Sequence, residues 1–210
     1  MSSTATHLHQ APASNRVRLG VLGSGAGTNY TALAEAIDRG ELEAEIVIVI
    51  SDAADAPLLT RARERETPAV FLDPGPWKTK MSDNTQDEMA RRLVEAGVEF
   101  VICAGFMRRL KDPVLKAFPN RILNIHPSLL PRFSGRDAIG QALAAGVTET
   151  GCTVHLVNEE IDSGDILAQQ QVAVRPDDTH ATLLARVNAA EHRLYPQTIA
   201  AYVKAWAEKT

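Results

Sequence analysis

The chain has 210 residues, of which 45% are hydrophobic and 23% charged, a composition typical of a globular protein with a full apolar core. Its net charge of −4 gives no basic footprint for nucleic acid or for an anionic membrane surface. No apolar run approaches the roughly 20 residues of a membrane-spanning helix. These properties exclude a nucleic-acid partner and a membrane partner from our expectations.

The ends and the cysteines of the chain predict its organisation and compartment. Residues 1–14 are polar and small and lack the basic start and apolar centre of a signal peptide, so we expect a disordered N-terminal tail. We expect residues 15–210 to form a single domain. Cys103 and Cys152 lie in apolar, strand-like runs without a CxxC pair. We interpret them as reduced core thiols of a cytoplasmic protein.

Short apolar runs alternate with helical patterns over the first part of the chain. Strands are predicted at residues 17–22, 45–50, 68–72, 99–104 and 121–125, and helices at residues 30–39, 57–66, 83–96 and 113–118. This β-α-β-α rhythm predicts an α/β fold with a Rossmann-like, mostly parallel and twisted sheet that carries helices on both faces.

The pattern changes in the last third of the chain. A helix is predicted at residues 138–145, strands at residues 151–157 and 166–174, and a final helix at residues 179–194. Because the link between the two strands is short, they should form an antiparallel C-terminal pair. The final helix should stop before Pro196, since proline interrupts helical hydrogen bonding.

A glycine-rich segment, Gly23-Ser24-Gly25-Ala26-Gly27-Thr28-Asn29, lies between the first strand and the first helix. Glycines let the backbone approach an anion, and the helix N-terminus supplies free N–H groups. We therefore interpret the segment as a phosphate site, because a simple tight turn needs only one or two glycines. A dinucleotide site with Asp52 as the ribose contact is the weaker interpretation, because Thr28 replaces the third glycine of that fingerprint.

Asn124 and His126 end an apolar run and are followed by Pro127. In an extended chain, residues two apart point to the same face, and proline keeps the residue before it extended. Two aligned hydrogen-bond donors suit an oxyanion site for acyl or formyl transfer to an amine, because they stabilise the tetrahedral species. A polar strand end with a capping asparagine and a surface histidine is equally compatible with these residues.

The turn Asp162-Ser163-Gly164-Asp165 joins the two late strands. A carboxylate here could pair with His126 or receive a proton from an attacking amine, although aspartate and glycine are also common turn residues. His155, on the preceding strand, is expected to be a core or supporting histidine. No His or Cys motif has metal-ligand spacing, so we expect no metal.

The segment at residues 104–110 follows the fourth strand, and ligands bind at the carboxyl ends of parallel strands. Phe106, Met107 and Leu110 could flank a flat ring, with Arg108 near an anionic tail. Core packing with solvated arginines is the equally compatible alternative. Residues 72–82 are loop-like, and we interpret them as a mobile flap.

Six motifs occur in order over nearly the whole chain: GSGAGTN, AGFMRRL, NIHPSLLP, GCTVHLV, IDSGDIL and AEHRLYP. With these motifs the chain resembles the folate-dependent formyltransferases, and among them the phosphoribosylglycinamide formyltransferases. The resemblance implies transfer of the formyl group of 10-formyltetrahydrofolate, a co-substrate, to the glycinamide amine of N1-(5-phosphoribosyl)glycinamide in de novo purine (IMP) biosynthesis. The partners would be these small molecules, and we expect a monomer or a homodimer.

The resemblance also implies roles for individual residues. Asn124 and His126 would bind the formyl oxygen, with His126 as the proton donor, and Asp162 would support the histidine. The ribonucleotide would contact Gly27, Thr28, Asn29 and Glu191. The folate would contact Lys80 in the flap, Met107, Arg108, Arg109, Leu110 and Asn124.

Some positions depart from the commoner family pattern and leave the acceptor amine open. Thr28 stands where relatives often have serine, Asp165 where they often have proline, and the segment at residues 134–137 differs from their Pro-Gly-x-His. The alternatives are another folate-dependent N-formyltransferase, a formyltetrahydrofolate hydrolase and a nicotinamide-dependent oxidoreductase. We expect a methionyl-tRNA enzyme to carry a further C-terminal domain, and the hydrolase to carry an N-terminal regulatory domain.

Overall fold

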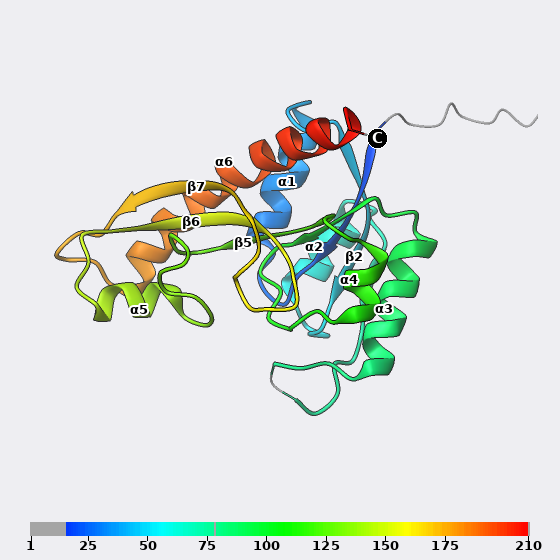
Figure 1. Ribbon diagram of the computed structural model, residues 1–210, viewed down its shortest axis with the longest axis horizontal. Coiled ribbons are helices and arrows are strands. Elements are labelled where there is room, and N and C mark those ends of the chain that lie inside the picture. The colour runs from blue at the N-terminus through cyan, green and yellow to red at the C-terminus, as the bar shows by residue number, and fades with distance from the viewer. Residues whose placement is uncertain (1–15, 78, 210) are drawn as a thin grey trace, which may run out of the picture.

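The computed structural model describes residues 16–77 and 79–209, and within them one sheet has the strand order β3-β2-β1-β4-β5-β6-β7 (Figure 1). The strands are β1 (Val17–Leu22), β2 (Ala44–Ser51), β3 (Ala69–Phe71), β4 (Phe100–Cys103), β5 (Ile122–His126), β6 (Glu149–Leu156) and β7 (Ile166–Ala173). The first five strands pair in parallel, whereas β6 is antiparallel to both β5 and β7. The predicted mostly parallel α/β fold with an antiparallel C-terminal pair is confirmed.

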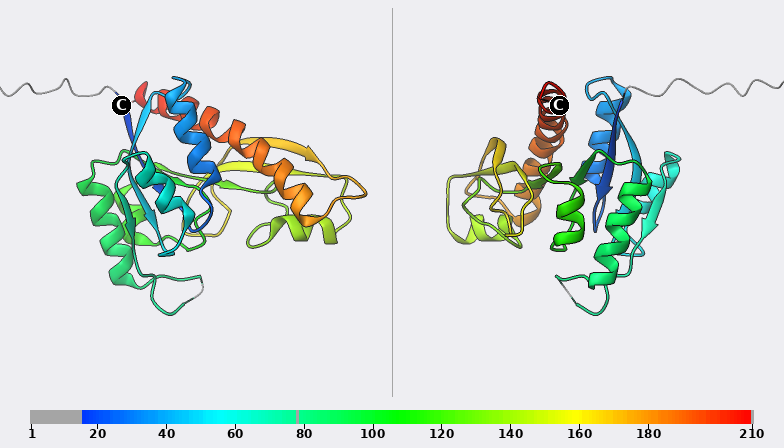
Figure 2. Two further views of the ribbon diagram at one scale, coloured as in Figure 1. Left: turned by 180° about the vertical axis from the view of Figure 1, so that it is seen from behind. Right: turned by 45° about the vertical axis from the view of Figure 1, so that its right-hand side comes forward.

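The helices cover both faces of the sheet (Figure 2). They are α1 (Thr28–Asp38), α2 (Pro57–Glu64), α3 (Asp83–Glu95), α4 (Asp112–Ala117), α5 (Ala138–Ala144) and α6 (His180–Ala207). Alternate strand residues enter two apolar layers: Leu19 and Val21 pack with α1 and α6, and Leu22 packs with α3 and α4. Helices α1 and α6 lie side by side on one face.

The strand order reverses between β1 and β4, and open α/β sheets bind ligands at such a point. The loops that follow these two strands are in direct contact. The backbone N–H of Ser24 donates to the carbonyl oxygen of Gly105 at 3.0 Å, and the N–H of Met107 donates to Oγ of Ser24 at 2.8 Å. The glycine-rich segment and the segment at residues 104–110 therefore share one edge of the sheet.

The prediction that the final helix stops before Pro196 is wrong, because α6 continues through this proline to Ala207. The apolar face of the helix extends past it: Tyr195, Ile199 and Val203 are all buried. An internal proline costs roughly 3 kcal/mol, and the burial of this face offsets that cost. Sequence patterning located the proline but could not reveal the surface that the second half of α6 covers.

The remaining helices and strands begin and end within two residues of the predicted bounds. The predicted tail at residues 1–14 lies outside the described residues. In the part of the chain that the structure describes, no helix is long and apolar enough to cross a membrane.

Ile199→Ala should lower the free energy of unfolding by about 2–5 kcal/mol, because it leaves a cavity beneath the second half of α6. Urea denaturation measures this change. Gln197→Ala, at an exposed position on the same helix, is the control and should change stability by about 0.5 kcal/mol or less. Equal urea concentrations at the midpoint of unfolding for the two variants would show that this half of α6 is not packed as described.

Candidate active site

The sheet register brings four polar side chains together at the end of β5. Asn124 lies opposite His155 in the β5–β6 pair, and His126 lies opposite Thr153. Directly opposed residues of antiparallel strands project from the same face, so all four side chains share one side of the sheet. Asp162 reaches this cluster from the loop between β6 and β7.

His126 is buried, and both of its ring nitrogens face oxygen atoms. Nδ1 lies 3.3 Å from Oδ2 of Asp162, and Nε2 lies 2.9 Å from the carbonyl oxygen of Phe133. A carbonyl oxygen and a carboxylate oxygen only accept hydrogen bonds. The imidazolium form, with a proton on each nitrogen, therefore satisfies both neighbours.

Asp162 is held as a carboxylate. Burial raises the pKa of Asp162, but its contact with His155, the backbone N–H of Gly135 and the positive charge of His126 together lower this pKa below its ordinary value. The N–H of Gly135 donates to Oδ2 at 2.8 Å. With a φ of 52°, Asp162 adopts a left-handed conformation that aspartate tolerates better than most residues. The turn thus presents a fixed negative charge to His126.

His155 orients the amide of Asn124. Nδ1 of His155 lies 2.8 Å from the carbonyl oxygen of Leu156, so this nitrogen carries the proton of the neutral ring. Nε2 then accepts from Nδ2 of Asn124 at 3.0 Å. An amide nitrogen has two N–H groups, so the second N–H of Asn124 remains for a ligand. The sequence analysis expected a supporting role for His155, and the β5–β6 register provides it.

The loop after His126 is fixed to the two last strands of the sheet. Oγ1 of Thr153 donates to the carbonyl oxygen of Ser128 at 2.6 Å and accepts from the N–H of Leu130 at 3.0 Å. Gln169 on β7 donates to the carbonyl oxygen of Leu130 at 2.9 Å. These bonds hold in place the segment that presents the carbonyl group of Phe133 to His126.

The glycine-rich segment leads directly into α1. Gly27 has a φ of 76°, and an added Cβ would lie 2.9 Å from Cα of Leu58, so this turn requires glycine. Nε of Arg61 on α2 donates to the carbonyl oxygen of Ala26 at 2.9 Å. A cation and the N-terminus of a helix therefore meet at the predicted phosphate site. The sequence carries no signal for Arg61 at this site, because only the packing of α2 brings it to this loop.

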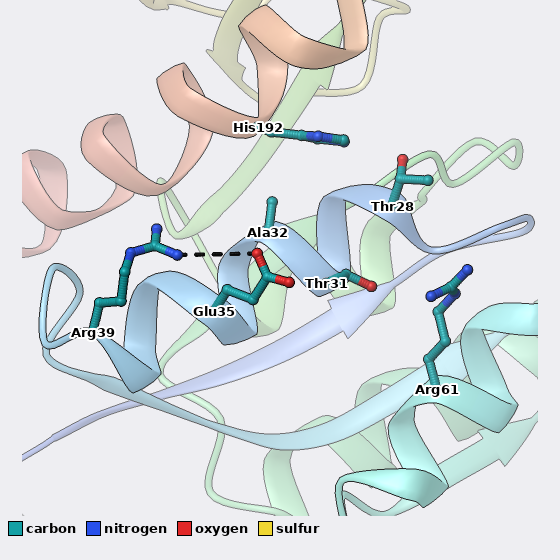
Figure 3. Close-up of a pocket in the computed structure, with 7 residues that line it drawn as sticks. All are labelled: Thr28, Thr31, Ala32, Glu35, Arg39, Arg61 and His192. Carbon is teal, nitrogen blue, oxygen red and sulfur yellow. Dashed lines mark ion pairs between the residues drawn. The ribbon is translucent and has the colours of Figure 1, made fainter. Parts of the chain in front are cut away.

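A shallow pocket of about 390 Å³ opens beside this loop (Figure 3). It is lined by Thr28, Thr31, Ala32, Glu35, Arg39, Arg61 and His192. Thr28 and Arg61 mark the end of the pocket at the glycine-rich loop, whereas Glu35 and Arg39 lie at the other end. The hydroxyl group of Thr28 and the guanidinium of Arg61 thus approach the same space.

Asn29 and Glu191 form a buried pair between α1 and α6. Nδ2 of Asn29 donates to Oε2 of Glu191 at 3.1 Å. Burial raises the pKa of Glu191 to about 7, although the hydrogen bond from Asn29 opposes this shift. Among the described residues, Oδ1 of Asn29 is buried without a hydrogen-bond partner. The pair therefore keeps unused hydrogen-bonding capacity next to the glycine-rich loop.

The predicted folate residues differ in their exposure. Met107 is 61% exposed and Lys80 is exposed, whereas Leu110 is buried in the apolar layer with α3 and α4. The side chain of Arg108 is only 14% exposed and pairs with Asp52. Nε of Arg109 donates to the carbonyl oxygen of Glu159 at 2.9 Å, so this arginine links its loop to the β6–β7 loop.

Two further exposed apolar side chains were not found from the sequence. Trp77 in the flap is 49% exposed and Ile161 in the β6–β7 loop is 63% exposed. Arg108 and Arg109, in the loop after β4, contact the backbone of these same two loops: Arg108 contacts the flap and Arg109 the β6–β7 loop. Among the described residues, no three His, Cys, Asp or Glu side chains gather as metal ligands.

Comparison with known proteins identifies the family. The sequence matches the family described as Formyl transferase over residues 17–199. The chain belongs to the formyl transferase family. It is 41% identical to the trifunctional purine biosynthetic protein adenosine-3 of Gallus gallus over 94% of this chain and 19% of that protein. The matching human protein is 40% identical over 88% of this chain and 18% of its own length. The chain thus spans about a fifth of the length of these relatives.

Solved formyltransferase structures match this chain over most of their length. Glycinamide ribonucleotide transformylase 1 from Symbiobacterium toebii is 44% identical with a TM-score of 0.86, covering 90% of this chain and 89% of that one. Phosphoribosylglycinamide formyltransferase from Bacillus halodurans is 39% identical with a TM-score of 0.84, covering 89% of this chain and 95% of that one.

Glu191 should make stability depend on pH. Because its pKa is raised to about 7 in the folded protein, its contribution to stability is full at low pH and is lost as the pH rises from about 4.5 through 7. Glu191→Gln should remove this loss, which we measure by urea unfolding at pH 5 and pH 8. Glu208→Gln, at an exposed position near the end of α6, should retain the wild-type profile. If the stability of wild type and of Glu191→Gln changed equally between pH 5 and pH 8, Glu191 would not be the group with the raised pKa.

Proposed function

We propose that this chain is a phosphoribosylglycinamide formyltransferase of de novo purine biosynthesis. It would transfer the formyl group of 10-formyltetrahydrofolate to the glycinamide amine of N1-(5-phosphoribosyl)glycinamide. The observation that carries the proposal is the cluster of Asn124, His126 and Asp162, set in a fold that closely matches solved enzymes of this activity.

The cluster suits formyl transfer to an amine. As the amine attacks the formyl carbon, negative charge develops on the formyl oxygen. The free N–H of Asn124 would stabilise that charge, together with the Nε2–H of His126, which would exchange its hydrogen bond to the Phe133 carbonyl oxygen for one to the formyl oxygen. Asp162 would accept the proton that the attacking amine releases, directly or through His126. The tetrahedral intermediate would then collapse by breaking the bond between the formyl carbon and N10, and this nitrogen would take up the proton as tetrahydrofolate leaves. His155 and Gly135 hold Asn124 and Asp162 in place, so the change during the reaction would be confined to the hydrogen bond of His126 to Phe133.

The glycine-rich loop would hold the ribonucleotide. Its phosphate would accept hydrogen bonds from the backbone at Gly27, Thr28 and Asn29, at the positive end of the α1 dipole. The guanidinium of Arg61 would add a full positive charge at the same place. Glu191 and Oδ1 of Asn29, which are buried beside the loop, would bind donor groups of the substrate.

The folate would lie along the loop that follows β4. Met107, Trp77 and Ile161 offer exposed apolar surface for flat rings, and the ammonium of Lys80 would attract the anionic glutamate tail. Arg108, Arg109 and Leu110 would contribute to the wall of the site, and Asn124 would reach the formyl group from β5. We further propose that the enzyme is cytoplasmic and acts as a monomer or a homodimer.

The purified wild-type protein should release tetrahydrofolate from 10-formyltetrahydrofolate only when the glycinamide ribonucleotide is present. His126→Ala should reduce this rate by about a hundredfold or more with folding intact, because it removes a donor to the developing oxyanion. His180→Ala, which changes an exposed histidine on α6, should keep the wild-type rate.

Three results would contradict this prediction. Release without the ribonucleotide would identify a formyltetrahydrofolate hydrolase. No release under either condition would direct the search to other acceptor amines and to the departures near Asp165 and Arg136. A normal rate in His126→Ala would remove the proposed chemistry.

Arg61→Ala should raise KM for the ribonucleotide by about tenfold, because one charge-assisted contact to phosphate is lost, while kcat changes little. Arg63→Ala removes an exposed arginine two residues further along the same helix and is the matched control. Steady-state kinetics with the ribonucleotide varied distinguishes the two variants. An unchanged KM in Arg61→Ala would place the phosphate elsewhere.

A further inference from the structure

A buried ion pair connects the end of β2 to the loop after β4. Nε of Arg108 donates to Oδ2 of Asp52 at 2.5 Å, and the two side chains are 14% and 4% exposed. Oδ1 of Asp52 is buried and has no hydrogen-bond partner among the described residues. The guanidinium is therefore the charged group that compensates this carboxylate, and each partner fixes the orientation of the other.

The same guanidinium also holds the flap. Nη1 of Arg108 donates to the carbonyl oxygen of Trp77 and, at 3.5 Å, to that of Lys80. The next residue of its loop adds a backbone link, because the N–H of Arg109 donates to the carbonyl oxygen of Thr79 at 3.2 Å. One arginine thus connects β2, the β4 loop and the flap.

The flap depends on these polar links because its middle buries little. Leu72 and Met81 anchor its two ends in the apolar layer, whereas Trp77, Thr79 and Lys80 are exposed. A segment with few buried apolar contacts opens readily unless its backbone hydrogen bonds persist. The Arg108 guanidinium therefore ties the backbone at Trp77 and Lys80 to the loop that carries Met107.

We propose that Asp52 is a positioning residue for the folate co-substrate, which acts by orienting Arg108 so that the flap carbonyl groups of Trp77 and Lys80 are held against the β4 loop. The inference rests on the proposed function and deepens it. Asp52 itself would not touch the folate. Its carboxylate keeps the guanidinium from turning toward solvent, and the guanidinium holds the flap backbone that carries Trp77 and Lys80 against the loop that carries Met107.

Asp52→Asn tests this role because it keeps the size of the side chain and removes its charge. We expect KM for 10-formyltetrahydrofolate and the Kd for tetrahydrofolate to rise by about tenfold, the effect of losing a charge-assisted contact. We expect kcat and KM for the ribonucleotide to stay within about twofold of wild type, because the reacting groups are untouched. Amide hydrogen exchange at residue 77 and at residues 79–82 should become faster in the variant without ligand.

Asp83→Asn is the matched control, because it breaks the exposed ion pair between Asp83 and Lys111 beside the same flap. An exposed pair contributes little, so the control should keep wild-type folate affinity and exchange. If Asp52→Asn does not fold, Arg108→Lys replaces it. Lysine keeps the positive charge next to Asp52 but lacks the branched guanidinium whose second nitrogen reaches the flap carbonyl oxygens. The same loss of folate affinity is therefore expected.

The outcomes separate this inference from the proposed function. Binding of tetrahydrofolate and hydrogen exchange need no ribonucleotide and no turnover. If the wild-type protein does not bind tetrahydrofolate, the proposed function fails. If the wild type binds it and Asp52→Asn binds equally well with unchanged flap exchange, the positioning role is overturned. A fall in kcat alone, or a rise only in KM for the ribonucleotide, would also overturn it.

Discussion

The antiparallel pairing of β6 with β5 is the constraint on which the candidate site depends. Its register places His155 opposite Asn124 and Thr153 opposite His126. His155 then orients the amide of Asn124, and Thr153 fixes the loop that presents the Phe133 carbonyl group to His126. A shift of one residue would turn both partners to the opposite face of the sheet. The backbone hydrogen bonds between β5 and β6 thus set the positions of the polar side chains in the site.

The immediate neighbours of each buried carboxyl group in this site set the direction in which its pKa shifts. Asp162 keeps a lowered pKa despite its burial, because its contact with His155, the N–H of Gly135 and the charge of His126 favour the carboxylate. Glu191 has the opposite environment: burial dominates and raises its pKa to about 7. The pKa values of these two carboxyl groups therefore shift in opposite directions, because Asp162 has a backbone donor and the charge of His126 beside it, whereas Glu191 has a single neutral amide.

The loop after β4 connects the two halves of the proposed site. It contacts the glycine-rich loop through Ser24, the flap through Arg108, and the β6–β7 loop through Arg109. Its arginines are engaged with backbone carbonyl groups and with Asp52, so in the free protein they order the loops of the site. Met107, Trp77 and Ile161 are exposed apolar side chains, one on this loop and one on each of the two loops that its arginines contact.

The sequence by itself determined the succession of strands and helices along the chain and the mostly parallel sheet, and it indicated that Asn124 and His126 share one face at the end of a strand. Local patterns carry this information, because side-chain periodicity and proline or glycine geometry act over a few residues. Only the tertiary structure decided that α6 continues through Pro196, that Arg61 meets the glycine-rich loop, and that Arg108 pairs with Asp52. These features depend on contacts between distant segments, whose packing and charge compensation outweigh local preference and leave no local signal in the sequence.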